Sequence, residues 1–184
     1  MANFEFYDAG LVRQLATNLF YGWGYNFYRL ENQLRADDQL VRTKAASLLG
    51  MAMASATDAE TEYRREFLRQ PSRQQPFPDA GAVATAQRLE RLVREIGVLE
   101  GLIQQQPAPE NDRMTQRYRE EEPTLRRLIH HDEQLVGQCE LLRSMLTGKN
   151  IASIVENLPN LERGLQAIRS TLRGREAVLL DRAP

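Results

Sequence analysis

The chain has 184 residues, of which 42% are hydrophobic and 27% charged, and its formal net charge is -1. This length is typical of one domain that buries its own core, and the low net charge with regularly recurring apolar residues excludes an intrinsically disordered chain. Basic and acidic residues are evenly spread along the sequence, so no segment has the local positive excess that binding to phosphate backbones requires. No nucleic-acid partner is expected.

Membrane and secreted proteins are also disfavoured. The longest uncharged run, residues 14–28, is shorter than the roughly 20 apolar residues that span a bilayer. Residues 1–10 carry Glu5 and Asp8 and no basic residue, unlike the start of a secretory signal. Cys139 is the only cysteine, which excludes an intramolecular disulfide and is compatible with a reducing compartment. We therefore expect a soluble, cytoplasmic protein with no membrane partner.

The first 70 residues predict one long helical region. Apolar residues recur at helical spacing from Leu11 to Phe67, and Asp8 is placed to cap the first turn. A single helix of about 60 residues would be about 90 Å long, more than the rest of the chain can cover. We therefore expect this N-terminal helix to be bent or broken. One candidate position is the Gly22/Gly24 pair, since glycine weakens a helix interior; the favoured one is residues 36–38, where Asp38 could cap a new helix, and a single bent helix is the alternative.

Proline-containing loops divide the remainder of the chain. Residues 71–81 and 107–111 lack apolar periodicity and are predicted loops. Helical periodicity predicts one helix between them, a short helix over 114–122 and a longer one over 123–148. The last helical region begins at Ile151, and Pro159 interrupts it, which predicts a kink or a short helix followed by a longer one.

These elements predict an all-α fold. No segment alternates apolar and polar residues over the length of a strand. We expect residues 1–184 to form a single domain with an N-terminal arm at 1–7, built as an up-and-down antiparallel bundle of four to five helices. Apolar spacings near 3.5 in the second and last helices predict coiled-coil-like packing between neighbours.

The most distinctive stretch is residues 20–28, which holds six aromatic residues, including the only tryptophan. On one helix the tyrosines share a face and the phenylalanine and tryptophan rings occupy others, which is more surface than one core stripe covers. Part of it should therefore contact the N-terminal arm, a second subunit or a ligand, because aromatic residues with polar tips favour interfaces. The candidate binding or interface residues are Tyr21, Trp23, Tyr25, Asn26, Tyr28 and Arg29.

Residues that could carry chemistry do not form a recognisable site. His130 and His131 are the only histidines, and no Glu stands three residues before either, as a di-metal bundle site requires. Adjacent helical residues point about 100° apart, so we expect one histidine at the solvent face and one at the edge of the helix seam. Cys139 falls on the apolar side of its helix and is predicted to be buried. No catalytic residue, metal or cofactor is predicted.

Two functions follow from this pattern. The first is a non-enzymatic helical bundle that self-associates, or docks a protein partner, through its aromatic N-terminal helix. The alternative is a small-molecule-binding or enzymatic bundle with a pocket lined by the aromatic residues and their polar neighbours, namely Tyr21, Tyr25, Asn26, Tyr28 and Arg29. The first function is preferred, because no acid, base or nucleophile converges on the aromatic stretch.

Overall fold

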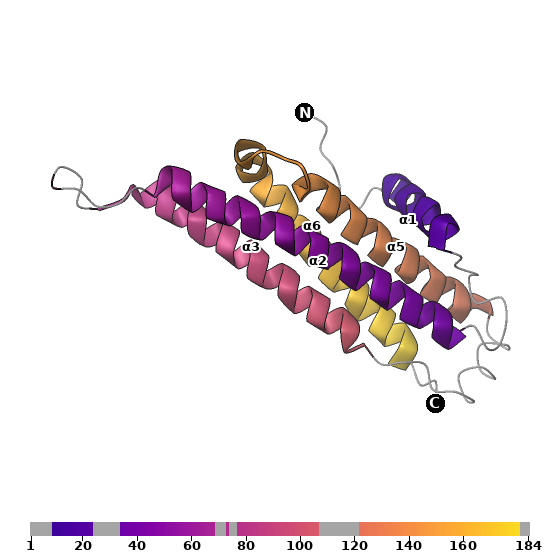
Figure 1. Cartoon of the computed structure of the whole chain (residues 1–184). Helices are drawn as coiled ribbons and strands as arrows, with labels where there is room; N and C mark the ends of the chain where they lie inside the picture. Colours follow the sequence, from indigo (N-terminus) through magenta and orange to yellow (C-terminus); the bar gives the residue numbers. More distant parts are fainter. Residues whose placement is uncertain (1–8, 24–33, 69–72, 74–76, 107–121, 181–184) are drawn as a thin grey trace.

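The computed structural model describes residues 9–23, 34–68, 73, 77–106 and 122–180 (Figure 1). These residues form five helices: α1 (Ala9–Trp23), α2 (Leu34–Phe67), α3 (Ala80–Gln104), α5 (Glu122–Leu146) and α6 (Ile151–Leu180). Strands are absent from this part of the chain, so the all-α prediction is confirmed. The predicted arm at 1–7 and loop at 107–111 lie outside the described residues, as does the predicted short helix over 114–122 apart from Glu122, which begins α5.

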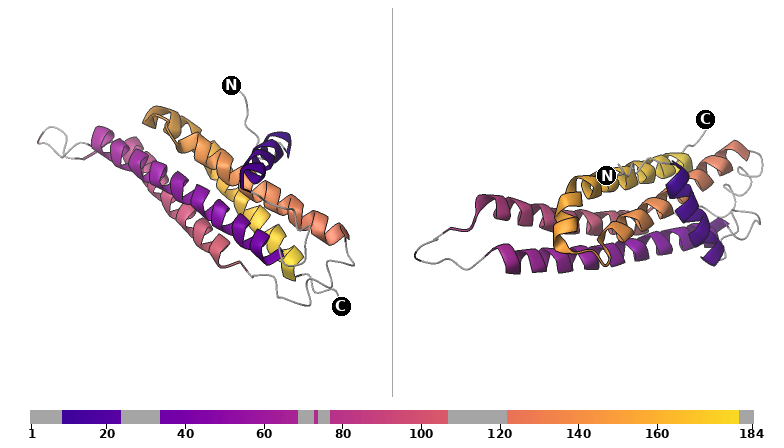
Figure 2. Two further views of the ribbon diagram at one scale, coloured as in Figure 1. Left: turned by 45° about the vertical axis from the view of Figure 1, so that its right-hand side comes forward. Right: turned by 90° about the horizontal axis from the view of Figure 1, so that it is seen from above.

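Helices α2, α3, α5 and α6 form a four-helix bundle in which consecutive helices run in opposite directions (Figures 1 and 2). α2 and α3 make one antiparallel hairpin, and α5 and α6 make the other. The two hairpins pack side by side so that α2 runs parallel to α5 and α3 runs parallel to α6. Two ion pairs between α3 and α6 show the parallel direction. Arg88 of α3 pairs with Glu162 of α6, and seven residues further along both helices Glu95 of α3 pairs with Arg169 of α6.

The core of the bundle follows the apolar stripes of the sequence. Leucine and isoleucine side chains from α3, α5 and α6 fill it, and α2 contributes a row that is largely alanine, including Ala45, Ala52, Ala56 and Ala59. Small side chains on α2 allow α3 to come close, and a Cβ added to Gly97 of α3 would stand 3.3 Å from the Met53 sulfur. Full burial of each leucine or isoleucine side chain contributes roughly 1.5–3 kcal/mol, so the apolar stripes of the four helices together supply most of the driving force for folding.

Local signals in the sequence set the ends of α3 and the course of α6. Asp79 caps α3 by accepting a hydrogen bond from the Ala82 backbone amide at 2.8 Å, so the helix begins inside the loop expected over 71–81. α6 continues past Pro159, and its first turns lie at an angle to the rest of the helix (Figure 2). Of the two expected outcomes, a kink is therefore the one observed. Proline removes one backbone donor and clashes with the preceding turn, which accounts for the bend.

The long N-terminal helix divides into two helices that lie in different directions, with residues 24–33 between them outside the described residues (Figure 2). α2 is a member of the bundle, whereas α1 lies across the outer side of α5. The favoured break at 36–38 is wrong, because these residues are inside α2. Asp38 does not cap a helix; its side chain is buried in the bundle, where it binds arginine.

Candidate functional site

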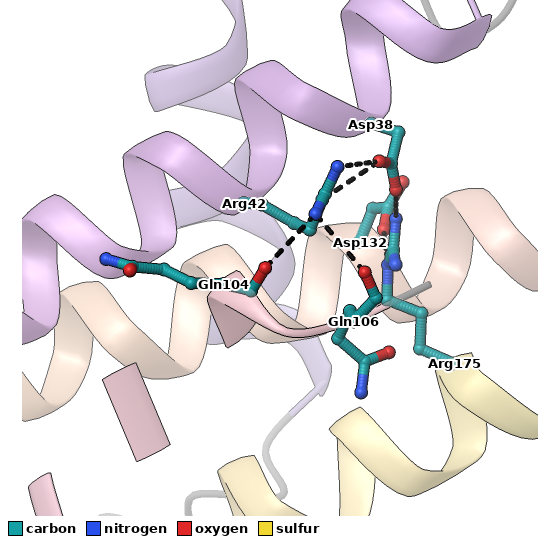
Figure 3. A network of polar contacts seen from close by, with 6 residues as sticks. All are labelled: Asp38, Arg42, Gln104, Gln106, Asp132 and Arg175. Carbon is teal, nitrogen blue, oxygen red and sulfur yellow. Dashed lines mark hydrogen bonds and ion pairs between the residues drawn. The ribbon is translucent and has the colours of Figure 1, made fainter. Parts of the chain in front are cut away.

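Two features of the described residues stand apart from ordinary core packing. One is the placement of α1 on the outside of α5. The other is a buried cluster of charged residues near the end of the bundle where α2 begins, formed by Asp38, Asp132 and Arg175 and extended by Arg42 (Figure 3).

The predicted interface residues fall mostly beyond what the structure describes. Tyr21 and Trp23 belong to the last turn of α1, but their side chains lie outside the described part of the chain. Tyr25, Asn26, Tyr28 and Arg29 lie in 24–33, which is also outside it. The role of these six residues therefore stays a prediction, and the structure adds where the helix that leads into them is placed.

α1 carries two apolar rows. Val12 and Ala16 are 3% and 0% exposed, and they form the row that faces the bundle. Leu11, Leu15 and Leu19 form a second row along the flank of the helix and are only partly buried. The remaining faces include Gln14 and Asn18, which are exposed. α1 thus keeps an incompletely covered leucine row beside its packed face.

Gly137 of α5 lies directly against Val12 of α1. A Cβ at this position would stand 2.7 Å from Cγ1 of Val12 and would overlap the Val12 carbonyl oxygen. The overlap involves backbone atoms, so a rotamer change cannot relieve it. Glycine therefore permits the backbones of α1 and α5 to cross in contact, as small residues do at close helix crossings. We name Gly137 with Leu141, one turn further along the same face and 4% exposed, the α1 seat.

The buried charge cluster joins three helices. Arg175 of α6 is fully buried and donates from Nε to Asp132 of α5 at 2.7 Å, and its second nitrogen, Nη2, pairs with Asp38 of α2. Both aspartates are 0% exposed. Burying an ion costs several kcal/mol, which the attraction between partners repays only when geometry and further hydrogen bonds are good. Here one guanidinium bridges two carboxylates from parallel helices, so its charge stabilises both.

Arg42 connects this cluster to the surface. Its Nε donates to Asp38 at 2.9 Å, and its Nη1 donates to the carbonyl oxygens of Gln104 and Gln106 at 3.4 and 3.2 Å (Figure 3). Carbonyl groups at the end of a helix lack intrahelical partners and favour cations. Arg42 therefore balances the second aspartate and closes the C-terminal end of α3, and the four charged side chains are formally neutral together.

Polar groups of α5 and α6 continue beside the cluster. Thr171 donates to Gln138 at 2.9 Å, both side chains being buried. His131 packs its ring against Gly174, where a Cβ would stand 2.7 Å from Cε1. Burial lowers the pKa of His131, and the neighbouring charge of His130 lowers it further. His130 is exposed and His131 is half-buried, which confirms the expected placement of the two histidines.

Three further features of the described residues bear on reaction chemistry. Within the described residues no group of three or more His, Cys, Asp or Glu side chains is placed to hold a metal ion. Cys139 is fully buried, as predicted, and burial raises the pKa of its thiol above the usual range. Two grooves of about 580 Å³ each lie along α3, one lined by Arg88, Glu162 and Pro159 and the other by Arg42 and Glu100. Arg88 and Glu162 bind each other at 2.9 Å, so the first groove presents a paired salt bridge.

Sequence reasoning missed the charge cluster, although the sequence carried a signal for it. Asp38, Asp132 and Arg175 each occupy a position where the apolar stripe of its helix continues on both sides. Arg175, for example, lies between Leu172 and Leu179 in the 3-4 spacing of the α6 stripe. A charged residue on a core stripe is usually paired, and three such residues of opposite signs on three helices indicate a buried ion pair or triad.

Comparison of the chain with models of protein families, with curated proteins and with solved structures finds no match in any of the three. Among the helices that the structure describes, none combines the length and apolar character needed to cross a bilayer.

Proposed function

We propose that the chain is a non-enzymatic helical-bundle protein that self-associates through its N-terminal region, formed by α1 and the aromatic residues that follow it. One observation carries this proposal. α1 packs on the outer side of α5 through Val12 and Ala16, and its three leucines, Leu11, Leu15 and Leu19, pack against the core while staying partly exposed.

The charge of α1 supports a contact between identical surfaces. Arg13 is the only charged residue in its fifteen residues. A two-fold interface places the same patch of both subunits together, so a surface with many like charges would repel itself. A nearly uncharged helix meets this requirement without needing a partner of opposite charge. The whole chain carries a formal charge of only -1, so it adds little long-range repulsion.

The area of a stable interface supports including the aromatic stretch, residues 20–28, in the proposed contact. A fifteen-residue helix is about 22 Å long, and one leucine row on it covers much less than the roughly 1,200–2,000 Å² that a stable protein interface buries. The aromatic residues at 20–28 directly extend this helix in sequence and add large rings with polar tips. Leucines and aromatic residues together would supply the missing area, with Trp23 and Tyr25 as the strongest single contributors.

Sedimentation velocity or light scattering across a concentration series tests the proposal. We expect a concentration-dependent rise from the 21.1 kDa chain mass toward twice that value. Tyr25→Ala, and separately the double variant Leu15→Gln/Leu19→Gln, should weaken the dimer at least tenfold. The matched control is Leu102→Gln, which changes an exposed leucine of α3 (40% exposed) and should leave the mass distribution as in the wild type. A monomer at every concentration would refute self-association.

A further inference from the structure

We propose that the groove between α3 and α6 binds a small organic dianion, either a phosphate monoester or a dicarboxylate. The groove has a volume of about 580 Å³, and its charged and polar border is formed by Arg88, Arg91, Glu95, Glu162, Arg163 and Gln166. We call it the α3–α6 groove. Its residues belong to the four-helix bundle and none belongs to α1 or to residues 20–28, so the site does not depend on the proposed self-association.

The α3–α6 groove has the size and the mixed lining of a small-molecule site. Ligand pockets are concave spaces of roughly 300–1,000 Å³ that combine apolar surface with a few polar groups, which fix the orientation of the ligand. The apolar part here comes from Leu92 and Leu165, which are 2% and 1% exposed, and from Pro159, where α6 bends (Figure 2). The organic body of a ligand can therefore rest on apolar side chains while its anionic groups reach the charged border.

Two arginines of the α3–α6 groove lack a carboxylate partner. In the described part of the chain neither Arg91 nor Arg163 forms an ion pair, and Arg163 donates only to Asn160, whose amide oxygen is neutral. Arg91 comes from α3 and Arg163 from α6, so each helix brings an unneutralised guanidinium group to the groove. The planar fork of N–H donors in a guanidinium matches the oxygens of a carboxylate or a phosphate. This pair of arginines therefore favours a ligand with two negative charges.

Both carboxylates of the α3–α6 groove are already paired with arginine. Glu162 accepts from Nε and Nη2 of Arg88 at 3.0 and 2.9 Å, and Glu95 lies 4.0 Å from Arg169. The bonds to Glu162 leave Nη1 of Arg88 to donate to a ligand. These two pairs are formally neutral, so the positive charge that remains at the groove is that of Arg91 and Arg163. A phosphate monoester carries a charge of about -1.5 to -2 at neutral pH, which balances the two arginines, and a dicarboxylate balances them in the same way.

Titration of the full chain with small anions, followed through its amide resonances, tests the site. Phenyl phosphate and succinate are the two dianionic probes, and benzoate is the monoanionic reference. We expect the dianions to cause saturable shifts at residues 88–95 and 159–166, and benzoate to bind about tenfold more weakly, because it can pair with only one arginine. Tighter binding of phenyl phosphate assigns the site to phosphate monoesters, and tighter binding of succinate assigns it to dicarboxylates. Absence of a saturable shift with both dianions, or shifts centred outside these two ranges, would overturn the proposal.

Substitutions of exposed side chains separate the groove from a general attraction to positive charge. Arg91→Gln and Arg163→Gln should each weaken binding of the tighter dianion about tenfold, since each removes a charged hydrogen bond to the ligand. The matched control is Arg173→Gln, which changes an exposed arginine of α6 outside the groove and should alter the affinity by less than about twofold. Glu162→Gln should tighten binding, because it removes a carboxylate from the groove and releases Arg88. Equal losses for all three arginine variants, or weaker binding by Glu162→Gln, would contradict the proposed site.

Discussion

Replacing Arg175 by methionine should destabilise the protein severely. The substitution keeps a long apolar stem and removes the charge that bridges Asp38 and Asp132, both 0% exposed. Loss of one partner from a buried ion pair costs about 3–5 kcal/mol, because an uncompensated charge stays in the core. Asp38 retains Arg42 at 2.8 Å, so its carboxylate keeps one cationic partner in the variant. For a chain of this length each kcal/mol lowers the melting temperature by about 2–4 °C, so we expect a decrease of about 10 °C.

Urea unfolding followed by circular dichroism measures this loss, and a surface pair provides the control. Arg88→Met makes the same substitution at the surface, where Arg88 forms a salt bridge with Glu162 and the two side chains are 41% and 45% exposed. Exposed pairs contribute about 0–1 kcal/mol, so this variant should stay close to wild type. A loss for Arg175→Met no larger than that for Arg88→Met would refute the reasoning. A triple variant, Asp38→Leu/Asp132→Leu/Arg175→Met, should recover most or all of the lost stability, since it removes the stranded charges as well.

The remaining predictions concern four single positions. Gly101→Ala should raise the free energy of unfolding by about 0.5–1 kcal/mol, because a Cβ there meets nothing within 4 Å and alanine favours the helix. Gly174→Ala should lower the free energy of unfolding by about 1 kcal/mol, because its Cβ would press on the His131 ring. Thermal melts that do not rank the Gly101 variant above the Gly174 variant would contradict this packing. The pKa of His131 is lower in the folded chain than in the unfolded chain, so the unfolded chain takes up the proton first as the pH falls. The contribution of His131 to the free energy of unfolding should therefore be fully present above pH 6.5 and decrease as the pH drops below it. His131→Gln should flatten this fall between pH 7.5 and pH 5 in urea titrations, and an unchanged pH dependence would count against it. The Cys139 thiol is buried with a raised pKa, so a thiol reagent should react with it only as urea unfolds the chain; fast reaction in native buffer would contradict its burial.

The helices could be predicted because their apolar periodicity is long and regular. The α3 stripe has seven buried residues at helical spacing, and proline, glycine and Asp79 mark its surroundings. The break in the N-terminal region was misplaced for a specific reason. Asp38 has the side chain of a good N-cap, but local preference was outweighed by a tertiary partner, Arg175, which is 137 residues away in sequence.

The pairing of the two hairpins could not be derived from the stripes. Each stripe defines which face of a helix is buried but not which neighbour it contacts or in which direction. Parallel contacts of α2 with α5 and of α3 with α6 join residues far apart in sequence, such as Arg88 and Glu162, which only the folded chain brings together. The α1 seat was equally hidden, because Gly137 differs from other helical glycines only through the backbone of Val12 above it.

The charge cluster specifies the axial register of the helices, which the apolar stripes alone leave undetermined. A bundle with heptad-like stripes can slip by about seven residues, roughly 10 Å along a helix, and still bury apolar side chains. Such a slip of α6 would bring Ile168 opposite Asp38 and Asp132 in place of Arg175, and both carboxylates would lose their bridging cation in the core. The penalty is of the order expected for Arg175→Met, about 3–5 kcal/mol, and an apolar layer at this level would impose none. We therefore infer that the cluster fixes register at the expense of maximal stability. The triple apolar variant should then fold stably but with broadened amide resonances from more than one register, and a single sharp set of resonances would show that packing alone selects the register.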